Sequence, residues 1–347
     1  MPALHHVELV SCEGLDDRAV VALAELLSTS SPERSEEDPP ISPVQLALDE
    51  RINPPWLRRT RAFAWGADGG LLAAALLEVE DRVDNRHLAW FEVSTTPDSR
   101  RQGLGTEVLE ALLPAALADG RTLVMGGVPE RGTGSAFAAA IGLTVGLREH
   151  RNRVRTADLP RAALESWIDD AAIKAIGYSL VNVDGPFPED LYEPYATLAD
   201  VMNDAPIDDL ELEDFDYTGD ELRSLQDAAE RRGTTRWTVL ARHDATGELV
   251  GLTELLIPQH DRWLAAQGDT GVVAAHRGHG LGRWLKAANA LRLLDEHPEV
   301  EVMQTWNAST NPYMLAINHA MGFRASNVQE LVQGKIAPLA ERLGGRT

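Results

Sequence analysis

The feature that most constrains this chain is an internal repeat. The segments "GLLAAALLEV" from Gly70 and "GELVGLTELL" from Gly247 are similar strand-like runs, and a glycine-rich loop follows each of them. Gly70 and Gly247 are 177 positions apart, and so are the loop residues Gly103 and Gly280. Two anchors with one offset indicate a duplicated domain. The length of 347 residues also favours two domains over one.

Both halves show the residue patterns of a mixed α/β sheet. In the second half, "RWTVLARH" and "ELVGLTELLI" are β-rich runs separated by Asp-Ala-Thr-Gly, which predicts a hairpin. A strand is expected near 269–275, and after the loop a helix from Leu281 to about Glu296, ended by Pro298. Further strands are expected at "YSLVNV" and "VEVMQTW", and further helices at 189–202, 218–232 and "NPYMLAINHAM". Hairpins that lead into strand–helix–strand units predict helices flanking a mixed sheet.

The segment "TADLPRAALE" is a charged connection with a proline between the two patterns. Such a segment is typical of a linker. We therefore expect an N-terminal domain over 1–157, a linker region over 158–177 and a C-terminal domain over 178–347.

The charge and the cysteine content restrict the class of function. The formal net charge of −22 disfavours binding to nucleic acid or to an anionic membrane. A single cysteine, Cys12, permits no internal disulfide, and the sequence shows no apolar run long enough to span a bilayer and no secretory signal, so a cytoplasmic location is expected. No tight His/Cys/Glu spacing predicts a metal site.

The glycine loops are candidate anion sites. Neither loop has the Lys-Ser/Thr ending of a P-loop or the third glycine of a dinucleotide-binding loop. Both fit [RQ]-x-x-G-x-G between a strand and a helix, at Arg100–Gly105 and at Arg277–Gly282. Free N–H groups at the start of a helix attract an anion such as a pyrophosphate, and glycines let it approach closely. The alternative is a tight turn without a ligand.

With the segment "TWNASTNPYMLAINHAMGF", these loops resemble the GNAT acetyltransferase superfamily in its actinobacterial form. The resemblance covers most of 178–331 and, more loosely, 60–156, and the tandem layout is similar to that of mycothiol synthases. It implies two GNAT-like domains, each a mixed, splayed sheet flanked by helices. It also implies acetyl-CoA as the cosubstrate, whose acetyl group passes directly to an amine.

The resemblance and the loop chemistry together give a set of candidate cofactor-binding residues. They are Val272, Val273, Ala274, Arg277, Gly278, His279, Gly280, Leu281, Gly282 and Asn311 in the second half, and Arg100, Gly103 and Gly105 in the first. A backbone N–H between Val272 and Ala274 is expected to polarise the thioester carbonyl. His279 is equally compatible with a solvated loop residue, and Asn311 with a helix cap.

Amine acetylation also needs a base, and the thiolate needs an acid. Asp269 and Glu254 are the candidate bases, with a salt bridge or a strand-edge carboxylate as the alternative for each. Tyr313 is the candidate acid, with surface or core packing as its alternative. GNAT domains often carry a tyrosine at the positions of Ala138 and Asn318.

The first half departs further from the pattern, with Gly142-Leu143 in place of Gly-Phe, so it is expected to be degenerate. We therefore predict an N-acetyltransferase for a small amine, with its chemistry in the second half. The nine acidic residues between Asp204 and Glu221 form either a solvated loop or a negative mouth for a cationic substrate. The alternative function is a non-catalytic tandem protein that binds acyl-CoA or has a structural role. The sequence leaves the oligomeric state open.

Overall fold

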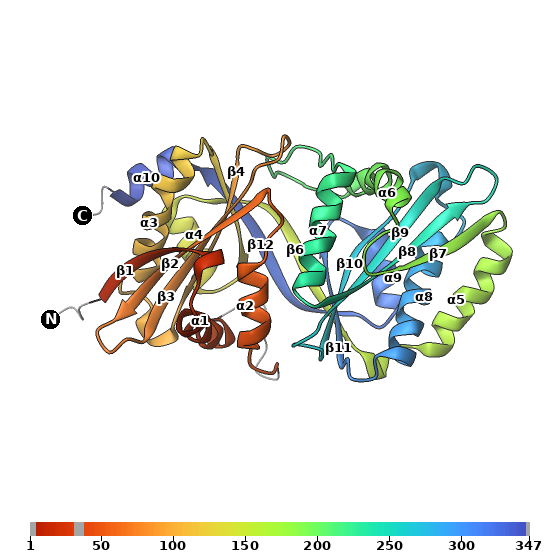
Figure 1. The fold of residues 1–347 in the computed structure, drawn as a ribbon, viewed down its shortest axis with the longest axis horizontal. Helices are drawn as coiled ribbons and strands as arrows, with labels where there is room; N and C mark the ends of the chain where they lie inside the picture. Colours follow the sequence, from red (N-terminus) through yellow and green to blue (C-terminus); the bar gives the residue numbers. More distant parts are fainter. Residues whose placement is uncertain (1–4, 31–37, 345–347) are drawn as a thin grey trace. The chain divides into compact units, whose positions relative to one another are not determined.

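A computed structural model describes residues 5–30 and 38–344 (Figure 1). The chain divides into two compact units. The N-terminal unit takes its described residues from Met1–Arg148, Asp208–Glu213 and Val328–Thr347. The C-terminal unit contains Glu149–Ile207 and Asp214–Asn327.

The N-terminal unit is a mixed sheet with helices on both faces. Its elements are β1 (His5–Ser11), η1 (Cys12–Gly14), α1 (Asp17–Ser30), α2 (Pro43–Arg51), β2 (Leu57–Gly66), β3 (Leu71–Glu80), β4 (Leu88–Thr95), η2 (Pro97–Ser99), α3 (Leu104–Ala118), β5 (Leu123–Pro129), α4 (Thr133–Ile141), the start of β6 (Thr144–Arg155), most of β12 (Arg324–Lys335), and α10 (Ile336–Gly344). The strand order β1-β2-β3-β4-β5-β12 is antiparallel except between β4 and β5, which are parallel.

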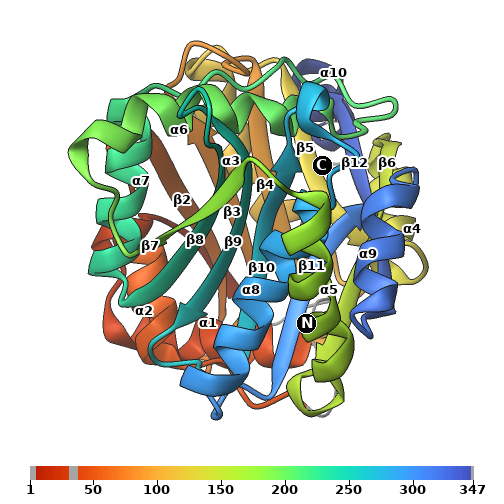
Figure 2. The same ribbon diagram turned by 90° about the vertical axis from the view of Figure 1, so that its right-hand side faces the viewer.

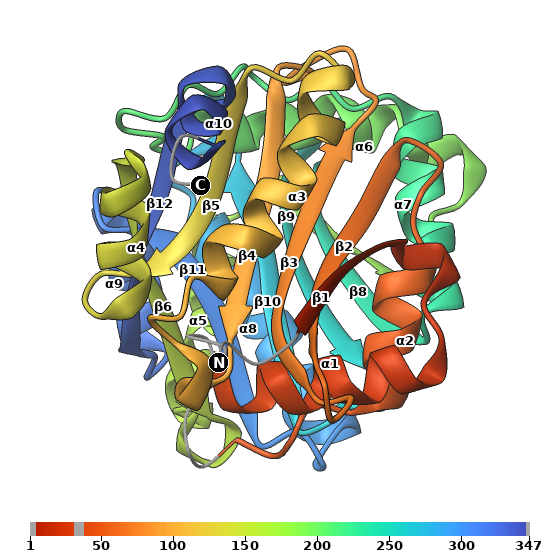
Figure 3. The ribbon, with the colours of Figure 1, turned by 90° about the vertical axis from the view of Figure 1, so that its left-hand side faces the viewer.

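Strand alternation explains why β2 and β3 are almost continuously buried. Ala62 and Ala64 of β2 face α3, which lies across the sheet in Figure 3, whereas Phe63 and Trp65 pack in the core beneath α1. Because successive side chains point to opposite faces, a strand covered on both sides is apolar throughout.

The C-terminal unit repeats this arrangement. Its elements are α5 (Arg161–Lys174), β7 (Tyr178–Asp184), α6 (Tyr192–Ala199), η5 (Asp200–Asp204), α7 (Gly219–Arg231), β8 (Thr234–His243), β9 (Leu249–Pro258), β10 (Leu264–Val272), η6 (Ala274–His276), α8 (Leu281–Glu296), β11 (Val302–Ala308), α9 (Pro312–Ala320) and the second part of β6; two further short 3-10 turns are η3 (Thr156–Asp158) and η4 (Glu189–Leu191). The order β7-β8-β9-β10-β11-β6 has one parallel pair, β10 with β11. Helices α8 and α5 cover one face (Figure 2), and α6 and α7 pack in the core of the other.

Each unit is completed by a strand from the other half of the sequence. In the N-terminal unit, residues 329–335 of β12 pair antiparallel with β5. In the C-terminal unit, residues 149–155 of β6 pair antiparallel with β11. Helix α10 follows β12 and contributes Ile336, Leu339 and Leu343 to the core beneath α3. The last segment of the chain therefore belongs to the N-terminal unit.

The units differ from the domain boundaries that the sequence predicts. Residues 328–347 and 208–213 lie in the N-terminal unit, and 149–177 lie in the C-terminal unit. The expected linker region contains helix α5, since Leu164, Trp167, Ile168 and Ala171 recur at helical spacing and pack in the cores beside α8. The predicted helix from Leu281 to Glu296 matches α8 at both ends.

The exchanged C-terminal segment gives a stability prediction. Leu339 is 3 % exposed, so Leu339→Ala is expected to lower the free energy of unfolding by about 2–5 kcal/mol, through lost burial and the cavity that remains. Urea denaturation measures this change. Leu117→Ala is the control, because Leu117 is 42 % exposed and should cost far less. Equal effects of the two substitutions would contradict the packing of α10 in this core.

The predicted fold class, a mixed α/β sheet flanked by helices in each of two tandem units, is confirmed. Within the described residues, no helix has the length and apolar character needed to cross a bilayer. Residues 5–30 and 38–344 contain no cluster of three or more His, Cys, Asp or Glu side chains that could hold a metal ion.

Candidate functional site

The glycine loop of the C-terminal unit joins β10 to α8. Gly278 and Gly280 have φ values of +88° and +77°, in the left-handed region that favours glycine. A Cβ at Gly278 would meet no atom within 4 Å, so its backbone is open to a ligand. Helix α8 starts directly after Gly280, which leaves its first N–H groups free to face an anion.

The loop side chains already have partners. Arg277 donates from Nε to the carbonyl of Val272 at 2.9 Å and from Nη2 to Asp204 of η5 at 2.6 Å. The His276 Nδ1 and the Tyr178 hydroxyl lie 2.9 Å apart, and His279 lies beside the Lys174 carbonyl at 3.3 Å. A phosphate that binds Arg277 would therefore compete with Asp204 for its guanidinium.

The corresponding loop of the N-terminal unit opens into a cleft. Gly103 has a φ of +90° and open space beside its Cα, and α3 starts directly after it. The cleft has a volume of about 540 Å³ and is lined by the loop from Ser99 to Thr106, by β4 and β5, and by the start of α4. The side chain of Arg100 lines this cleft and has no hydrogen bond or ion pair with another residue of the described ranges.

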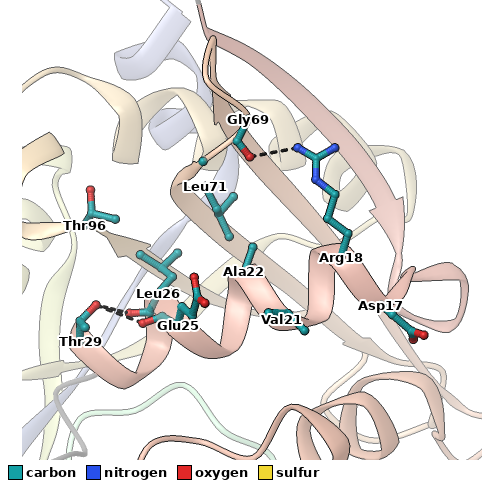
Figure 4. Close-up of a pocket in the computed structure, with 11 residues that line it drawn as sticks. Asp17, Arg18, Val21, Ala22, Glu25, Leu26, Thr29, Gly69, Leu71 and Thr96 are labelled. Carbon is teal, nitrogen blue, oxygen red and sulfur yellow. Dashed lines mark hydrogen bonds between the residues drawn. The ribbon is translucent and has the colours of Figure 1, made fainter.

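A second hollow of the N-terminal unit, of about 660 Å³, follows α1 (Figure 4). Its arginine, Arg18, points to the turn at Gly69 and donates to that carbonyl at 3.0 Å. Asp17 is paired with Arg51 at 2.7 Å. Because its Arg18 and Asp17 are already engaged, this hollow is a weaker candidate than the cleft at Gly103.

A β-bulge in β10 brings the two predicted carboxylates together. Gln267 pairs with Leu255 and Thr270 with Thr253, so Gly268 and Asp269 together oppose Glu254. A Cβ at Gly268 would lie 3.3 Å from the Cβ of Glu254, so the glycine permits this close approach. The bulge is held in place by Gln267, whose Nε2 donates to the Glu254 carbonyl at 2.5 Å.

Glu254 is a buried member of a polar network. It is 7 % exposed, and its Oε1 accepts hydrogen bonds from the guanidinium of Arg236 and from the hydroxyl of Tyr195. Burial and the Glu254 charge raise the pKa of Tyr195 well above its usual value, so this hydroxyl stays a donor. The Glu254 carboxylate is therefore engaged by a guanidinium and a hydroxyl.

Asp269 is in a different state. Its side chain keeps an exposed face and has no hydrogen bond or ion pair within the described part of the chain. Protein atoms still surround the carboxylate closely, and this desolvation, together with repulsion from Glu254, raises the pKa of Asp269 to about 6, although Arg236 opposes the shift. A carboxylate with a pKa near 6 is ionised at neutral pH and more basic than an ordinary aspartate.

The predicted backbone donors are only partly available. The N–H of Val273 donates to the Val250 carbonyl at 2.9 Å and is therefore occupied. Since successive N–H groups of a strand point to opposite sides, that of Val272 points away from β9. On that side β10 pairs with β11 only over Leu264–Ala266, so the Val272 N–H faces the open side of the diverging strands.

Asn311 and Tyr313, the predicted site residues at the start of α9, share no hydrogen bond with Glu254 or Asp269 among the described residues. Asn311 caps the helix, because its Oδ1 accepts from the Met314 N–H at 3.2 Å. Tyr313 is 85 % exposed, and its hydroxyl makes no hydrogen bond with a residue that the structure describes. Asn318, at the position where GNAT domains often carry tyrosine, is fully buried and donates to Asn307 at 2.7 Å.

Sequence reasoning did not identify Arg236, Tyr195 or Gln267. Arg236 lies on β8, two residues from Thr238, the direct partner of Glu254, so the two are diagonal neighbours across the strands. That relation requires the strand register, which the sequence does not state. Tyr195 lies on α6, and no local pattern indicates its contact with β9.

The network predicts a measurable dependence of stability on Arg236. Arg236→Met is expected to lower the free energy of unfolding by about 3–5 kcal/mol, because it leaves the buried Glu254 carboxylate without its cation. Urea denaturation measures the change, with Arg262→Met as the control for an exposed pair with Glu299, which should cost under about 1 kcal/mol. A cost for Arg236→Met as small as that of the control would refute the buried ion pair.

Residues 21–130 match the model of the acetyltransferase (GNAT) family. This segment includes the loop Arg100–Gly105, so the family match falls on the half that the sequence pattern predicts to be degenerate. A comparison with curated proteins found no match.

Solved structures match nearly the whole chain. One is described as a tandem GNAT protein from the clavulanic acid biosynthesis pathway; it is 25 % identical, with a TM-score of 0.77 over 95 % of this chain and 99 % of that one. Another is a GCN5-related N-acetyltransferase from Sphaerobacter thermophilus, 15 % identical, with a TM-score of 0.65 over 95 % and 96 % of the two chains. A third is the glucosamine N-acetyltransferase region of a fungal multi-domain β-N-acetylglucosaminidase, 13 % identical, with a TM-score of 0.66 over 96 % of this chain and 38 % of that one.

Proposed function

We propose that this chain, which has the tandem GNAT fold, is an acetyl-CoA-dependent N-acetyltransferase that transfers the acetyl group directly to a small amine in its C-terminal unit. The observation that carries the proposal is the bulge in β10. It presents the Asp269 carboxylate, which has no hydrogen bond or ion pair with a described residue, on the strand that leads into the glycine loop before α8.

The loop has the donor set that a pyrophosphate needs. The N–H groups from Gly278 to Gly282 at the start of α8 supply uncharged donors and a favourable helix dipole. Arg277 supplies a positive charge once it leaves Asp204, and His279 lies within the same loop. The N–H of Val272 is the donor that we assign to the thioester carbonyl.

Asp269 supplies the base. An alkyl ammonium has a pKa of about 10.4, so a base must remove its proton before the nitrogen can attack. Asp269 accepts this proton, directly or through a water molecule, and desolvation together with the negative charge of Glu254 makes Asp269 more basic. For protonation of the departing thiolate we assign Tyr313, whose hydroxyl is exposed and free to reorient.

The acceptor that we propose is cationic in solution. Asp200, Asp214 and Asp216 lie close enough in the C-terminal unit that burial and the charges of the other two raise the pKa of Asp200. Such a concentration of negative charge attracts a protonated amine and repels nucleic acid. The other part of the acidic stretch, residues 208–213, belongs to the N-terminal unit, where Glu213 and Asn85 are joined by hydrogen bonds.

For the N-terminal unit we propose acyl-CoA binding. Its loop has the same geometry around Gly103, its Arg100 has no competing partner within the described residues, and its cleft of about 540 Å³ is already open. The alternative for the whole chain is a non-catalytic protein that binds acyl-CoA, and the Arg277–Asp204 pair and the exposed Tyr313 favour that alternative.

Incubation with acetyl-CoA and a panel of small amines, with release of free thiol as the readout, tests the proposal. Amine-dependent thiol release with formation of the N-acetyl product supports it. Calorimetric binding of CoA without turnover on any amine of the panel would support the non-catalytic alternative. Absence of both would exclude an acyl-CoA function and leave a structural role.

A further inference from the structure

The cleft of the N-terminal unit lies where β4 and β5 separate. The two strands pair in parallel over Leu88–Trp90 and Leu123–Met125. Beyond Trp90 and Met125 this pairing ends, and residues of both strands line the cleft up to the glycine loop. One wall is therefore β4, and the other is β5 with its neighbour β12.

A side chain from the end of the sequence lies over the β5 wall. Gln329 of β12 is paired with Pro129, which makes it a diagonal neighbour of Gly127. A Cβ added to Gly127 would lie 1.7 Å from Nε2 and 2.8 Å from Cδ of Gln329. The amide therefore occupies the space that any side chain at 127 would need.

The Gln329 amide is available to a ligand. It lines the cleft together with Trp90 and Phe137, and it is partly exposed. Its nitrogen and oxygen form no hydrogen bond with a residue in the described ranges. A primary amide offers two donors and an acceptor, so it can bond with both the carbonyl and the N–H groups of a bound molecule.

The other unit differs at the matching positions. Strand β11 pairs in parallel with β10 as β5 pairs with β4, so the two units can be aligned by this pairing, with Val302 at the position of Leu123. In this alignment Ala308 corresponds to Pro129 and Trp306 to Gly127. The partner of Ala308 on β6 is Glu149, which takes the place of Gln329. A neutral amide over a glycine is thus particular to the N-terminal cleft, whereas the C-terminal unit has an acidic residue and a tryptophan there.

We infer that Gln329 is a specificity-determining residue of the N-terminal cleft, where its amide binds the polar arm of an acyl-CoA and its bulk restricts the acyl group to a short chain. The inference rests on the proposed binding of acyl-CoA to this unit. With the pyrophosphate at Gly103, the rest of the molecule extends along the cleft toward the point where β4 and β5 meet. Gln329 lies on the wall of that path, and its removal opens the space above Gly127.

The test uses the full chain with Gly280→Asp, so that binding reports the N-terminal unit. Calorimetry gives the dissociation constants of acetyl-CoA and butanoyl-CoA for this chain and for the same chain with Gln329→Ala or Gln329→Met. Gln329→Ala is expected to shift the ratio of the two constants roughly tenfold toward butanoyl-CoA, since two more methylene groups can be buried. Gln329→Met keeps the length but not the amide, so it should weaken both ligands about fivefold and leave the ratio unchanged.

Two other outcomes are distinguishable. If the chain with Gly280→Asp alone binds neither ligand, the assignment of the N-terminal cleft to acyl-CoA is wrong, and the inference falls with it. If both ligands bind but Gln329→Ala leaves their ratio as it was, the inference alone is overturned. Thermal unfolding of each variant shows whether it keeps the folded state of the parent.

Discussion

Gly280→Asp is expected to abolish turnover, whereas Gly103→Asp should change it by no more than a few-fold. The new carboxylate at 280 would stand at the start of α8, where we place the pyrophosphate, and like charges in that position repel strongly. CoA affinity of the C-terminal unit should fall more than about a hundredfold, the size of effect that a loss of roughly 3 kcal/mol produces. Steady-state thiol release and calorimetry measure the two quantities.

Controls separate charge from backbone strain. Gly280→Ala places a Cβ at the same positive φ without a carboxylate, so it should retain much of the activity that Gly280→Asp loses. Gly120→Asp puts the same charge at a glycine with a φ of +78° and open space around it, at the far end of α3, and should be silent. If Gly103→Asp abolishes turnover and Gly280→Asp does not, the N-terminal unit is the active one.

Asp269→Asn is expected to reduce kcat by about 10²–10⁴-fold, the usual contribution of a general base. The substitution keeps the shape of the side chain and removes its basicity. The parent enzyme should also lose activity below a pH of about 6, where a carboxylate with that pKa becomes protonated, and this acidic limb should disappear in the variant. A pH–rate profile of kcat/KM measures both effects.

A stability measurement shows whether a loss of activity is chemical. The folded state raises the pKa of Asp269, so folding opposes the ionisation of this carboxyl group. Its ionised form therefore destabilises the folded state, and this destabilisation is complete above a pH of about 6. Asp269→Asn should therefore be at least as stable as the parent at pH 7.

If Asp269→Asn and Glu254→Gln both keep rates within about threefold of the parent, neither carboxylate is the base, because a base contributes at least 10²-fold.

The local features of this fold were readable from the sequence. The offset between Gly103 and Gly280 predicted two tandem units, and glycines before an amphipathic run predicted the start of α8 at Leu281. The repeat is visible by comparing the sequence with itself, and the helix start depends on neighbours within a few residues, so the sequence alone determines both. The order of strand and helix patterns in each half likewise predicts a mixed sheet from the sequence alone.

Long-range pairing decided the rest. The pairing of β12 with β5 in the N-terminal unit depends on which sheet edge buries its apolar face. The contact of Glu254 with Arg236 and Tyr195 needs both the register of β8 and the packing of α6. The placement of Asp269 opposite Glu254 needs the bulge in β10. A sequence lists carboxylates, but only the tertiary structure places one beside a cation and leaves the other free, because charge pairing acts between residues that are distant in the chain.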